Sequence, residues 1–311
     1  MKSLIEINSS PVVDFLDLLL QDKSTKQNII WATDSYELLG DGFSDEDQIT
    51  RDRLLINPSL IRPRIQKTIE AQQERTRKKA EVYTPAWLCN KMNNDCDETW
   101  FGRKDVFNVE TTEHTWNVID ENIEFPKGKT WKGYVDSRRL EIACGEAPYL
   151  VSRYDASTGE TIYPLKRRIG QLDRKLRVID ENVPYYDEWV KWVVRAFESS
   201  YGFEYQGDSL LIARINLLMT FFEYYQNRWN KVPDSTLLRL IVNKIAWNLW
   251  QMDGIKDTVP LGKPHTEYEQ LSLFEMEPTL ILSAEERNAI PCKVYDWRQK
   301  QSVLFRSLKE R

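Results

Sequence analysis

Three acidic side chains follow short apolar runs, and their chemistry suits a ligand that contains a nucleoside. The first is Glu141 or Glu146, on either side of Cys144 and Gly145 in LEIACGEAP, the second is Glu204 in YGFEY, and the third is Asp253, which ends NLWQMD. In an open α/β sheet, ligands sit outside the carboxyl ends of parallel strands, where main-chain N–H groups and acids face them. A carboxylate at such a place can accept hydrogen bonds from ribose hydroxyls. We therefore predict a ligand site where these strand ends meet.

The spacing of these residues argues against a dinucleotide as the ligand. A dinucleotide-binding fold has a glycine-rich first turn and an acid about 20 residues later. Here Gly145 stands without the other glycines of that turn, and Glu204 follows 59 residues after it. The sequence therefore favours a different adenosine-containing compound.

Alternating strands and helices are needed to position the three acids. Apolar residues at helical or extended spacing predict a strand through LEIAC, a helix over 187–199, a strand over 201–205 and a helix over 207–228. The IAWNLWQMD segment then predicts a strand or turn that ends at Asp253. This order is typical of a doubly wound α/β sheet. Further helices are expected over 10–22, over about 64–79 and after Pro85.

Four segments resemble, in order, the motifs of adenine-N6 DNA methyltransferases. EVYTPAWLCNKM is similar to the motif that folds over the methionine part of S-adenosylmethionine (SAM), and LEIACGEAPYL to the family's strand and loop with Cys-Gly. YGFEYQGDSLLIARINLLMTF resembles the motif whose acid holds the ribose, and IAWNLWQMDGI the motif whose Asp receives the adenine amine. Together they cover about residues 75–257 and are most like the methylase subunits or domains of bacterial restriction-modification systems.

The resemblance implies an α/β, Rossmann-like SAM-dependent methyltransferase fold with a helical N-terminal extension. Its expected parts are a helical region over 1–80, a SAM-binding domain over 81–260 and a C-terminal strand or arm over 261–311. It also implies SAM as the cofactor. The residues implied to bind SAM are Tyr83, Thr84, Pro85, Glu141, Ala143, Cys144, Gly145, Glu204, Tyr205, Asp253 and Gly254.

The chain departs from the family's pattern in two places. The motif of Asn or Asp followed by Pro-Pro-aromatic, which in the family holds the target amine beside a flipped base, is not found, so the catalytic residues stay unknown. In addition, Glu146-Ala147 stands where the family has Ser-Gly, and a carboxylate there is expected to repel that of the cofactor. We interpret the chain as the cofactor half of a split enzyme, with a second methyltransferase or specificity subunit as partner. The alternative is a noncatalytic DNA-binding or regulatory protein that retains the fold.

Two basic segments are candidate contacts for DNA. The formal net charge of -5 does not favour a general polyanion binder, so such contacts must be local. Residues 62–79 carry seven basic residues and two acids, and residues 166–177 carry six basic residues and one acid. A solvated helix face is the alternative for either segment. Within the first segment, the predicted DNA-binding residues are Arg75, Arg77, Lys78 and Lys79.

The remaining composition predicts a cytoplasmic protein without a metal site. The four cysteines form no Cys-x-x-Cys pair, so we expect reduced thiols and no zinc. Asp14 and Asp17 interrupt the only apolar stretch near the N-terminus, which is too short for a membrane span. No contact with a membrane is therefore expected.

Overall fold

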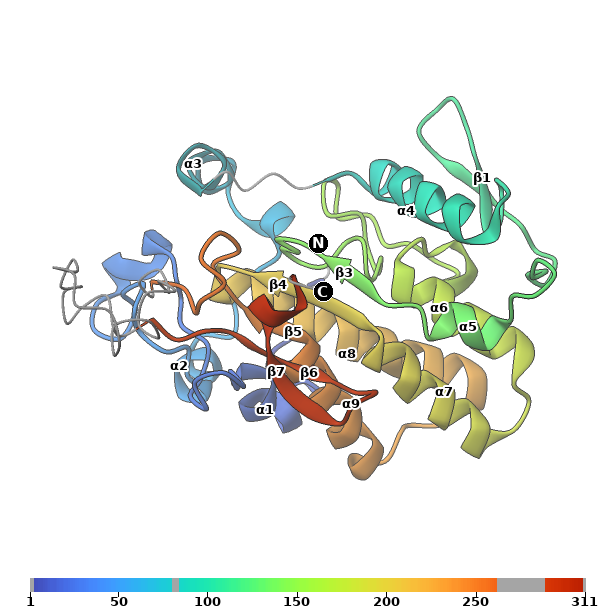
Figure 1. The fold of residues 1–311 in the computed structure, drawn as a ribbon. Coiled ribbons are helices and arrows are strands. Elements are labelled where there is room, and N and C mark those ends of the chain that lie inside the picture. The colour runs from blue at the N-terminus through green and yellow to red at the C-terminus, as the bar shows by residue number, and fades with distance from the viewer. Residues whose placement is uncertain (1–2, 80–83, 262–288, 310–311) are drawn as a thin grey trace, which may run out of the picture.

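A parallel three-stranded sheet forms the centre of the protein. The computed structural model describes residues 3–79, 84–261 and 289–309. The sheet has the order β3-β4-β5, with β3 at Arg139–Glu141, β4 at Ser200–Glu204 and β5 at Leu249–Gln251. Both strand pairs are parallel, and the mixed α/β class expected from the sequence is confirmed (Figure 1).

Two helices lie between each pair of consecutive strands. α6 (Gln171–Asn182) and α7 (Tyr186–Glu198) connect β3 to β4, and α8 (Gly207–Trp229) and α9 (Ser235–Asn248) connect β4 to β5. The predicted helices over 187–199 and 207–228 and the strand over 201–205 are confirmed to within one residue at each end. α6 was not expected, because its basic residues hide the apolar face that it buries.

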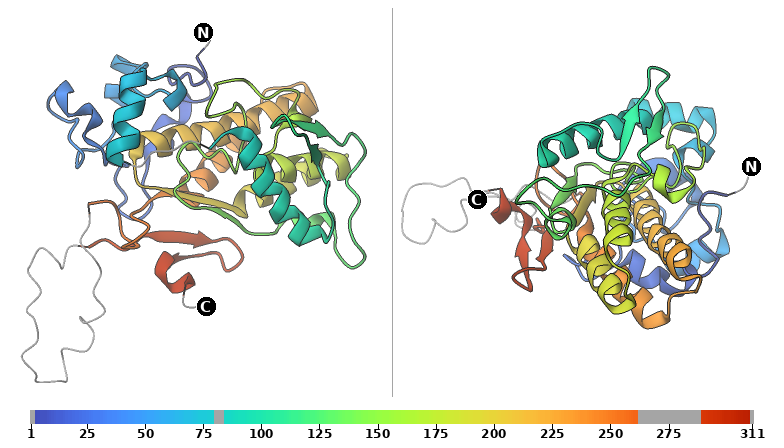
Figure 2. Two further views of the ribbon diagram at one scale, coloured as in Figure 1. Left: turned by 90° about the horizontal axis from the view of Figure 1, so that it is seen from above. Right: turned by 90° about the vertical axis from the view of Figure 1, so that its right-hand side faces the viewer.

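The two faces of the sheet are covered differently. Helices α6 to α9 lie on one side, and a hairpin of β6 (Lys293–Asp296) and β7 (Gln301–Leu304) lies on the other (Figure 2). Phe203 and Trp250, which are paired neighbours on β4 and β5, pack under this hairpin. The second face thus carries a hairpin in the described residues, where a doubly wound sheet has helices. The expected C-terminal strand is present as this hairpin.

The N-terminal region shares its hydrophobic core with the helices of the sheet. Leu16, Leu19 and Trp31 belong to the same buried cluster as residues of α8 and α9. The predicted helix over 10–22 is shorter than expected, and the predicted helix over 64–79 is interrupted. The elements of this region are η1 (Val13–Phe15), α1 (Leu16–Leu20), η2 (Asp34–Leu39), α2 (Arg51–Ile56), η3 (Arg64–Gln66) and α3 (Ile69–Lys79).

Further elements surround the sheet. They are α4 (Ala86–Phe101), the antiparallel hairpin of β1 (Asn108–Glu110) and β2 (Trp116–Val118), α5 (Trp131–Val135), η4 (Leu165–Arg167) and η7 (Phe305–Leu308). Side-chain hydrogen bonds cap some of the helices. At the start of α9, the side chain of Asp234 accepts a hydrogen bond from the Leu237 amide. Among the described residues, no helix is both long and apolar enough to cross a membrane.

Candidate functional site

The loop after β3 crosses the tip of β4. Ala143, Gly145 and Ala147 have φ values of 48°, 53° and 64°, in the left-handed region. Cys144 donates its main-chain N–H to the carbonyl of Phe203 over 2.8 Å. This bond continues the pairing of the two strands beyond β3, so the loop is held at the carboxyl end of the sheet.

Glu204 at the end of β4 joins two of the strand-end loops. Its Oε2 accepts a hydrogen bond from the Gly145 amide at 2.8 Å, and its Oε1 accepts one from the Gln206 amide at 3.1 Å. The residue is 7% exposed. Burial raises the pKa of this carboxyl, and the amides oppose that effect. The Tyr205 amide also hydrogen-bonds to this carboxyl. The two oxygens together have about four lone pairs, so the group can still accept a hydrogen bond from a ligand.

Asp253 lies at the neighbouring strand end, but it hydrogen-bonds within its own turn. The Met252 amide donates to the carbonyl of Glu204 at 3.0 Å, which holds the end of β5 beside β4. Asp253 Oδ1 accepts from the amides of Ile255 and Lys256 at 3.0 and 3.2 Å. The structure therefore brings Asp253 to the predicted tip and shows that it also caps the turn there.

Tyr205 and Gly254 flank these two acids. Burial, followed by the negative charge of Asp253, raises the pKa of the Tyr205 phenol. The hydroxyl therefore stays protonated and can donate a hydrogen bond. A Cβ at Gly254 would lie 2.8 Å from Cε2 of Phe203, so a larger residue there would require the ring to move.

Glu141 holds the turn that follows the Gly145 loop. Its carboxylate accepts hydrogen bonds from the amides of Tyr149 and Leu150, at 3.3 and 3.0 Å. Burial is the largest cause that raises its pKa to about 8, and the charge of Glu204 adds to it. Like Glu204 and Asp253, Glu141 thus accepts hydrogen bonds from the protein's own main chain.

Replacing Glu141 with Gln should change how stability depends on pH. The folded protein holds the Glu141 proton more tightly than the unfolded chain, so the free energy of unfolding falls as pH rises from about 4.5 to about 8. Glu141→Gln removes this titration, so we expect the variant to lose less stability over that interval. Urea unfolding at several pH values measures it, with the exposed Glu160→Gln as control. Parallel curves for wild type and Glu141→Gln would contradict the assignment.

The segment predicted to fold over the cofactor lies against the same loop. Pro85 precedes α4, and its carbonyl accepts from the amide of Cys89. The Thr84 side chain hydrogen-bonds to Tyr149 and lowers the pKa of its phenol, against the larger effect of burial. Asn93 of α4 donates to the Tyr149 carbonyl at 3.0 Å. Thr84 and Pro85 are thus placed beside the turn that Glu141 holds, and Tyr83 lies outside the described residues.

Glu146 is buried and hydrogen-bonds to residues outside the strand ends. Its Oε1 accepts from the Arg64 amide at 2.7 Å, and its Oε2 accepts from the Tyr154 hydroxyl at 2.6 Å. These two bonds engage both oxygens of the carboxylate, and the expectation that it repels a cofactor stays a prediction. Asn216 of α8, which the sequence analysis missed, donates to the Glu146 carbonyl at 3.0 Å. This bond holds the Gly145 loop against α8.

Cys144 is a buried packing residue. Burial raises the pKa of its thiol well above the usual range, so the thiol stays protonated. A Cβ at Gly202 would lie 3.3 Å from Cys144 Sγ, so glycine at that position makes room for the side chain. In the described part of the chain, no group of three or more His, Cys, Asp or Glu side chains could hold a metal ion.

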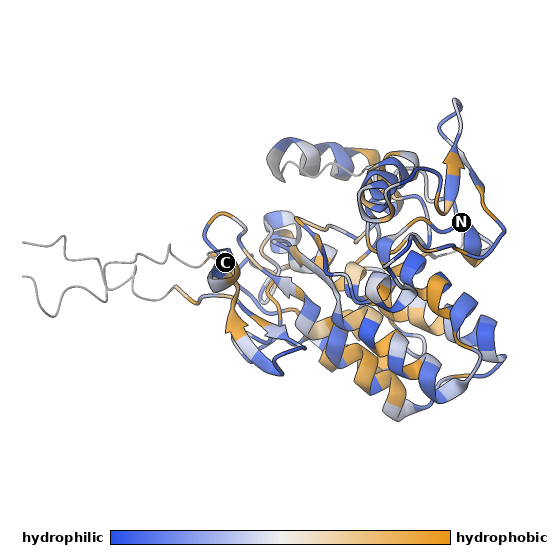
Figure 3. Ribbon diagram, turned by 45° about the vertical axis from the view of Figure 1, so that its right-hand side comes forward, coloured by the Kyte–Doolittle hydropathy of each residue, from blue (hydrophilic) through white to orange (hydrophobic). Residues whose placement is uncertain are grey.

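The two basic segments differ in their surroundings. α3, which carries Arg75, Arg77, Lys78 and Lys79, lies at the periphery and is mainly hydrophilic (Figure 3). Arg77 is exposed there. The second segment is largely internal, and four of its cations are buried: Arg168, Arg174, Lys175 and Arg177. These four are therefore excluded as a solvated face or as phosphate contacts.

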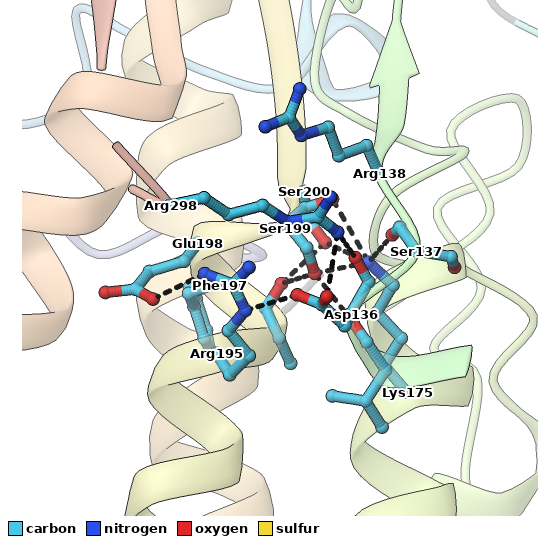
Figure 4. A network of polar contacts seen from close by, with 12 residues as sticks. Asp136, Ser137, Arg138, Lys175, Arg195, Phe197, Glu198, Ser199, Ser200 and Arg298 are labelled. Atoms are coloured by element: carbon cyan, nitrogen blue, oxygen red, sulfur yellow. Dashed lines mark hydrogen bonds and ion pairs between the residues drawn. The ribbon is translucent and has the colours of Figure 1, made fainter. Parts of the chain in front are cut away.

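Lys175 illustrates the internal use of that segment. Its Nζ donates to the Ser137 carbonyl and to Ser199 Oγ, both at 2.7 Å (Figure 4). Burial lowers the pKa of this lysine well below its ordinary value, and the charge of Arg139 adds to the effect. The side chain thus ties the beginning of β3 to the beginning of β4, at the end of the sheet opposite to the candidate site.

Comparison with known proteins does not identify the site. Comparisons with protein-family models, with curated proteins and with solved structures found no match. The geometry of the strand ends and the sequence motifs therefore carry the functional argument.

Proposed function

We propose that this chain is the SAM-binding subunit of a split bacterial DNA adenine-N6 methyltransferase of a restriction-modification system. The observation that carries the proposal is the contact between the Gly145 amide and the Glu204 carboxylate. It joins the two motifs that resemble the SAM-binding motifs of that family, at the carboxyl ends of adjacent parallel strands. Such strand ends are where α/β sheets bind nucleotides.

Each residue at the tip has a role in this proposal. Glu204 accepts a hydrogen bond from the ribose through the lone pair that the three amides leave, and Asp253 receives the adenine amine. Thr84 and Pro85 cover the methionine part of SAM from the side of Tyr149. When bound, SAM supplies the methyl group. Target recognition and the groups that hold the target amine come from a second polypeptide.

Calorimetric titration with SAM tests the proposal. The purified chain should bind SAM at one site per molecule, and S-adenosylhomocysteine should compete because it carries the same ribose and adenine. Methionine alone should bind far more weakly, because it reaches neither Glu204 nor Asp253. Absence of measurable heat at high protein concentration would contradict the proposal.

A noncatalytic DNA-binding protein is the second candidate function. The peripheral position of α3 and the exposure of Arg77 favour it. Phosphate contacts would make the affinity for DNA fall steeply with salt, by a slope of about 0.9 per neutralised phosphate. Titration of labelled duplex DNA with and without SAM separates the two functions. Salt-dependent binding together with no binding of SAM would favour this candidate.

A further inference from the structure

Glu141 is a buried acid that no cation neutralises in the described part of the chain. Elsewhere in the protein, the buried Asp97 forms an ion pair with Arg174. Glu141 is 7% exposed, and the one charged side chain that acts on its pKa is another acid, Glu204. Its carboxyl accepts hydrogen bonds from two main-chain amides. Burial without a cation disfavours the charged form of a carboxyl.

The titratable groups around Glu141 are neutral or acidic. They are Cys89 of α4, Cys144 of the Gly145 loop, Tyr149 of the following turn and Glu204 of β4. Burial raises the pKa of both thiols and of the phenol, and the charge of Glu141 adds to this effect. These three groups therefore stay protonated and uncharged. A positive charge that a ligand brings here has an acid to pair with.

Glu141 lies beside the segment that covers the methionine part of SAM in the proposed function. The Cys89 thiol donates to the Thr84 carbonyl at 3.7 Å, and its pKa responds to the charge of Glu141. The Thr84 side chain also hydrogen-bonds to Tyr149, whose amide donates to Glu141 at 3.3 Å. Two routes of contact thus connect Glu141 to Thr84. The methionine part of SAM carries the sulfonium, so the positive charge of the cofactor belongs on this side of the site.

We propose that Glu141 makes the site prefer SAM, whose sulfonium is positively charged, over S-adenosylhomocysteine, whose sulfur is neutral. The inference rests on the proposed function and assigns the selectivity of the same site. An opposite charge favours the ionised form of a carboxyl. Binding of SAM therefore shifts Glu141 from its protonated to its ionised form, and the proton passes to the solvent. The ribose and adenine contacts of Glu204 and Asp253 are common to both compounds and do not discriminate between them.

The preference for SAM should increase with pH. Burial is the main cause that raises the pKa of Glu141 to about 8 in the free protein, and bound SAM should lower it. A fall of about one unit would raise the ratio of the two affinities about sevenfold between about pH 6.5 and about pH 9. At about pH 7, the same fall would release about 0.4 proton for each SAM bound. Both compounds carry the amino group of methionine, so its titration largely cancels in the ratio.

Calorimetric titration of the full chain with SAM and with S-adenosylhomocysteine measures both quantities. Each titration is repeated at several pH values and in two buffers of different ionisation enthalpy. In wild type, the ratio of affinities should rise with pH, and SAM should release more protons than S-adenosylhomocysteine. In Glu141→Gln, the ratio should be independent of pH, and at about pH 9 it should be roughly tenfold lower than in wild type. A merely structural role would weaken both compounds by the same factor and leave the ratio unchanged.

Two further variants serve as controls. Glu204→Gln should weaken SAM and S-adenosylhomocysteine by about the same factor at about pH 9, because both carry the ribose. Glu160→Gln, at an exposed position, should leave both affinities and the released protons unchanged.

The outcomes separate this inference from the proposed function. Binding of both compounds with the same pH dependence of the ratio in wild type and Glu141→Gln would overturn the role of Glu141 and keep the SAM site. Equal proton release with the two compounds in wild type would also overturn it. Failure of wild type to bind either compound would contradict the proposed function and this selectivity together.

Discussion

Replacing Glu204 with Ala should weaken SAM binding by about 1.5–3 kcal/mol, or roughly 10- to 150-fold. The carboxylate is buried at the tip of β4, where hydrogen bonds to a charged acceptor are worth more than neutral ones. The substitution also frees the Gly145 amide, which loses its acceptor. Calorimetric titration of wild type and variant with SAM measures the loss.

Two further variants separate ligand contact from a structural role. Glu204→Gln keeps one oxygen as acceptor for an amide, so it should fold and still bind SAM less tightly than wild type. Glu198→Ala changes an acid at the opposite end of β4 and should leave SAM affinity unchanged. Thermal unfolding of each variant shows that the chain is folded. Wild-type affinity in folded Glu204→Ala would remove Glu204 from the site.

Replacing Asp97 with Ala should lower the free energy of unfolding by about 3–5 kcal/mol, the usual cost of removing one partner of a buried ion pair. Asp97 on α4 pairs with Arg174 on α6, and both side chains are 1% exposed. Asp97 also accepts from the Tyr134 hydroxyl at 2.9 Å. Without the acid, the buried guanidinium loses its charged acceptor and keeps the neutral amide oxygens of Asn90 and Asn94, and the buried phenol loses its acceptor.

Urea unfolding followed by tryptophan fluorescence measures the effect of Asp97→Ala. The matched control is Asp95→Ala, because Asp95 is exposed on the same helix. The control should stay within about 0.5 kcal/mol of wild type. A similar small effect for Asp97→Ala would show that the ion pair does not hold α4 against α6.

The strand-end geometry could be predicted from the sequence because it depends on local patterns. The apolar periodicity of the sequence predicts the first and last residues of α7, β4 and α8 to within one residue. An acid that directly follows an apolar strand must lie at the sheet's carboxyl edge, and Glu204 does. Its contact with Gly145 follows from the adjacency of β3 and β4.

The partners of the other acids could not be predicted, because they come from distant segments. Glu146 bonds to the amide of Arg64, 82 residues earlier in the chain. Glu141 turns toward the amides at 149 and 150, which depends on how the loop folds back. No periodicity in the sequence encodes these contacts.

The basic segment over 166–177 shows the same limit for charge patterns. Its local excess of positive charge predicts a solvated or phosphate-binding face. Arg174 instead pairs with Asp97, which lies 77 residues earlier, and Arg168 pairs with Glu223, 55 residues later. Because the neutralising acids are remote in the sequence, composition alone could not show that these cations are buried.

Hydrogen exchange with and without SAM tests most directly that the ends of β3, β4 and β5 form an adenosine site. With SAM at saturation, the account predicts slower exchange in peptides that cover residues 142–150 and 203–207, and unchanged exchange in the β1–β2 hairpin. The amide of Gly145 donates to Glu204, the predicted contact of the ribose, so its peptide should show the clearest change. No change in either peptide at a SAM concentration that saturates binding would contradict the account, and so would protection confined to another part of the chain.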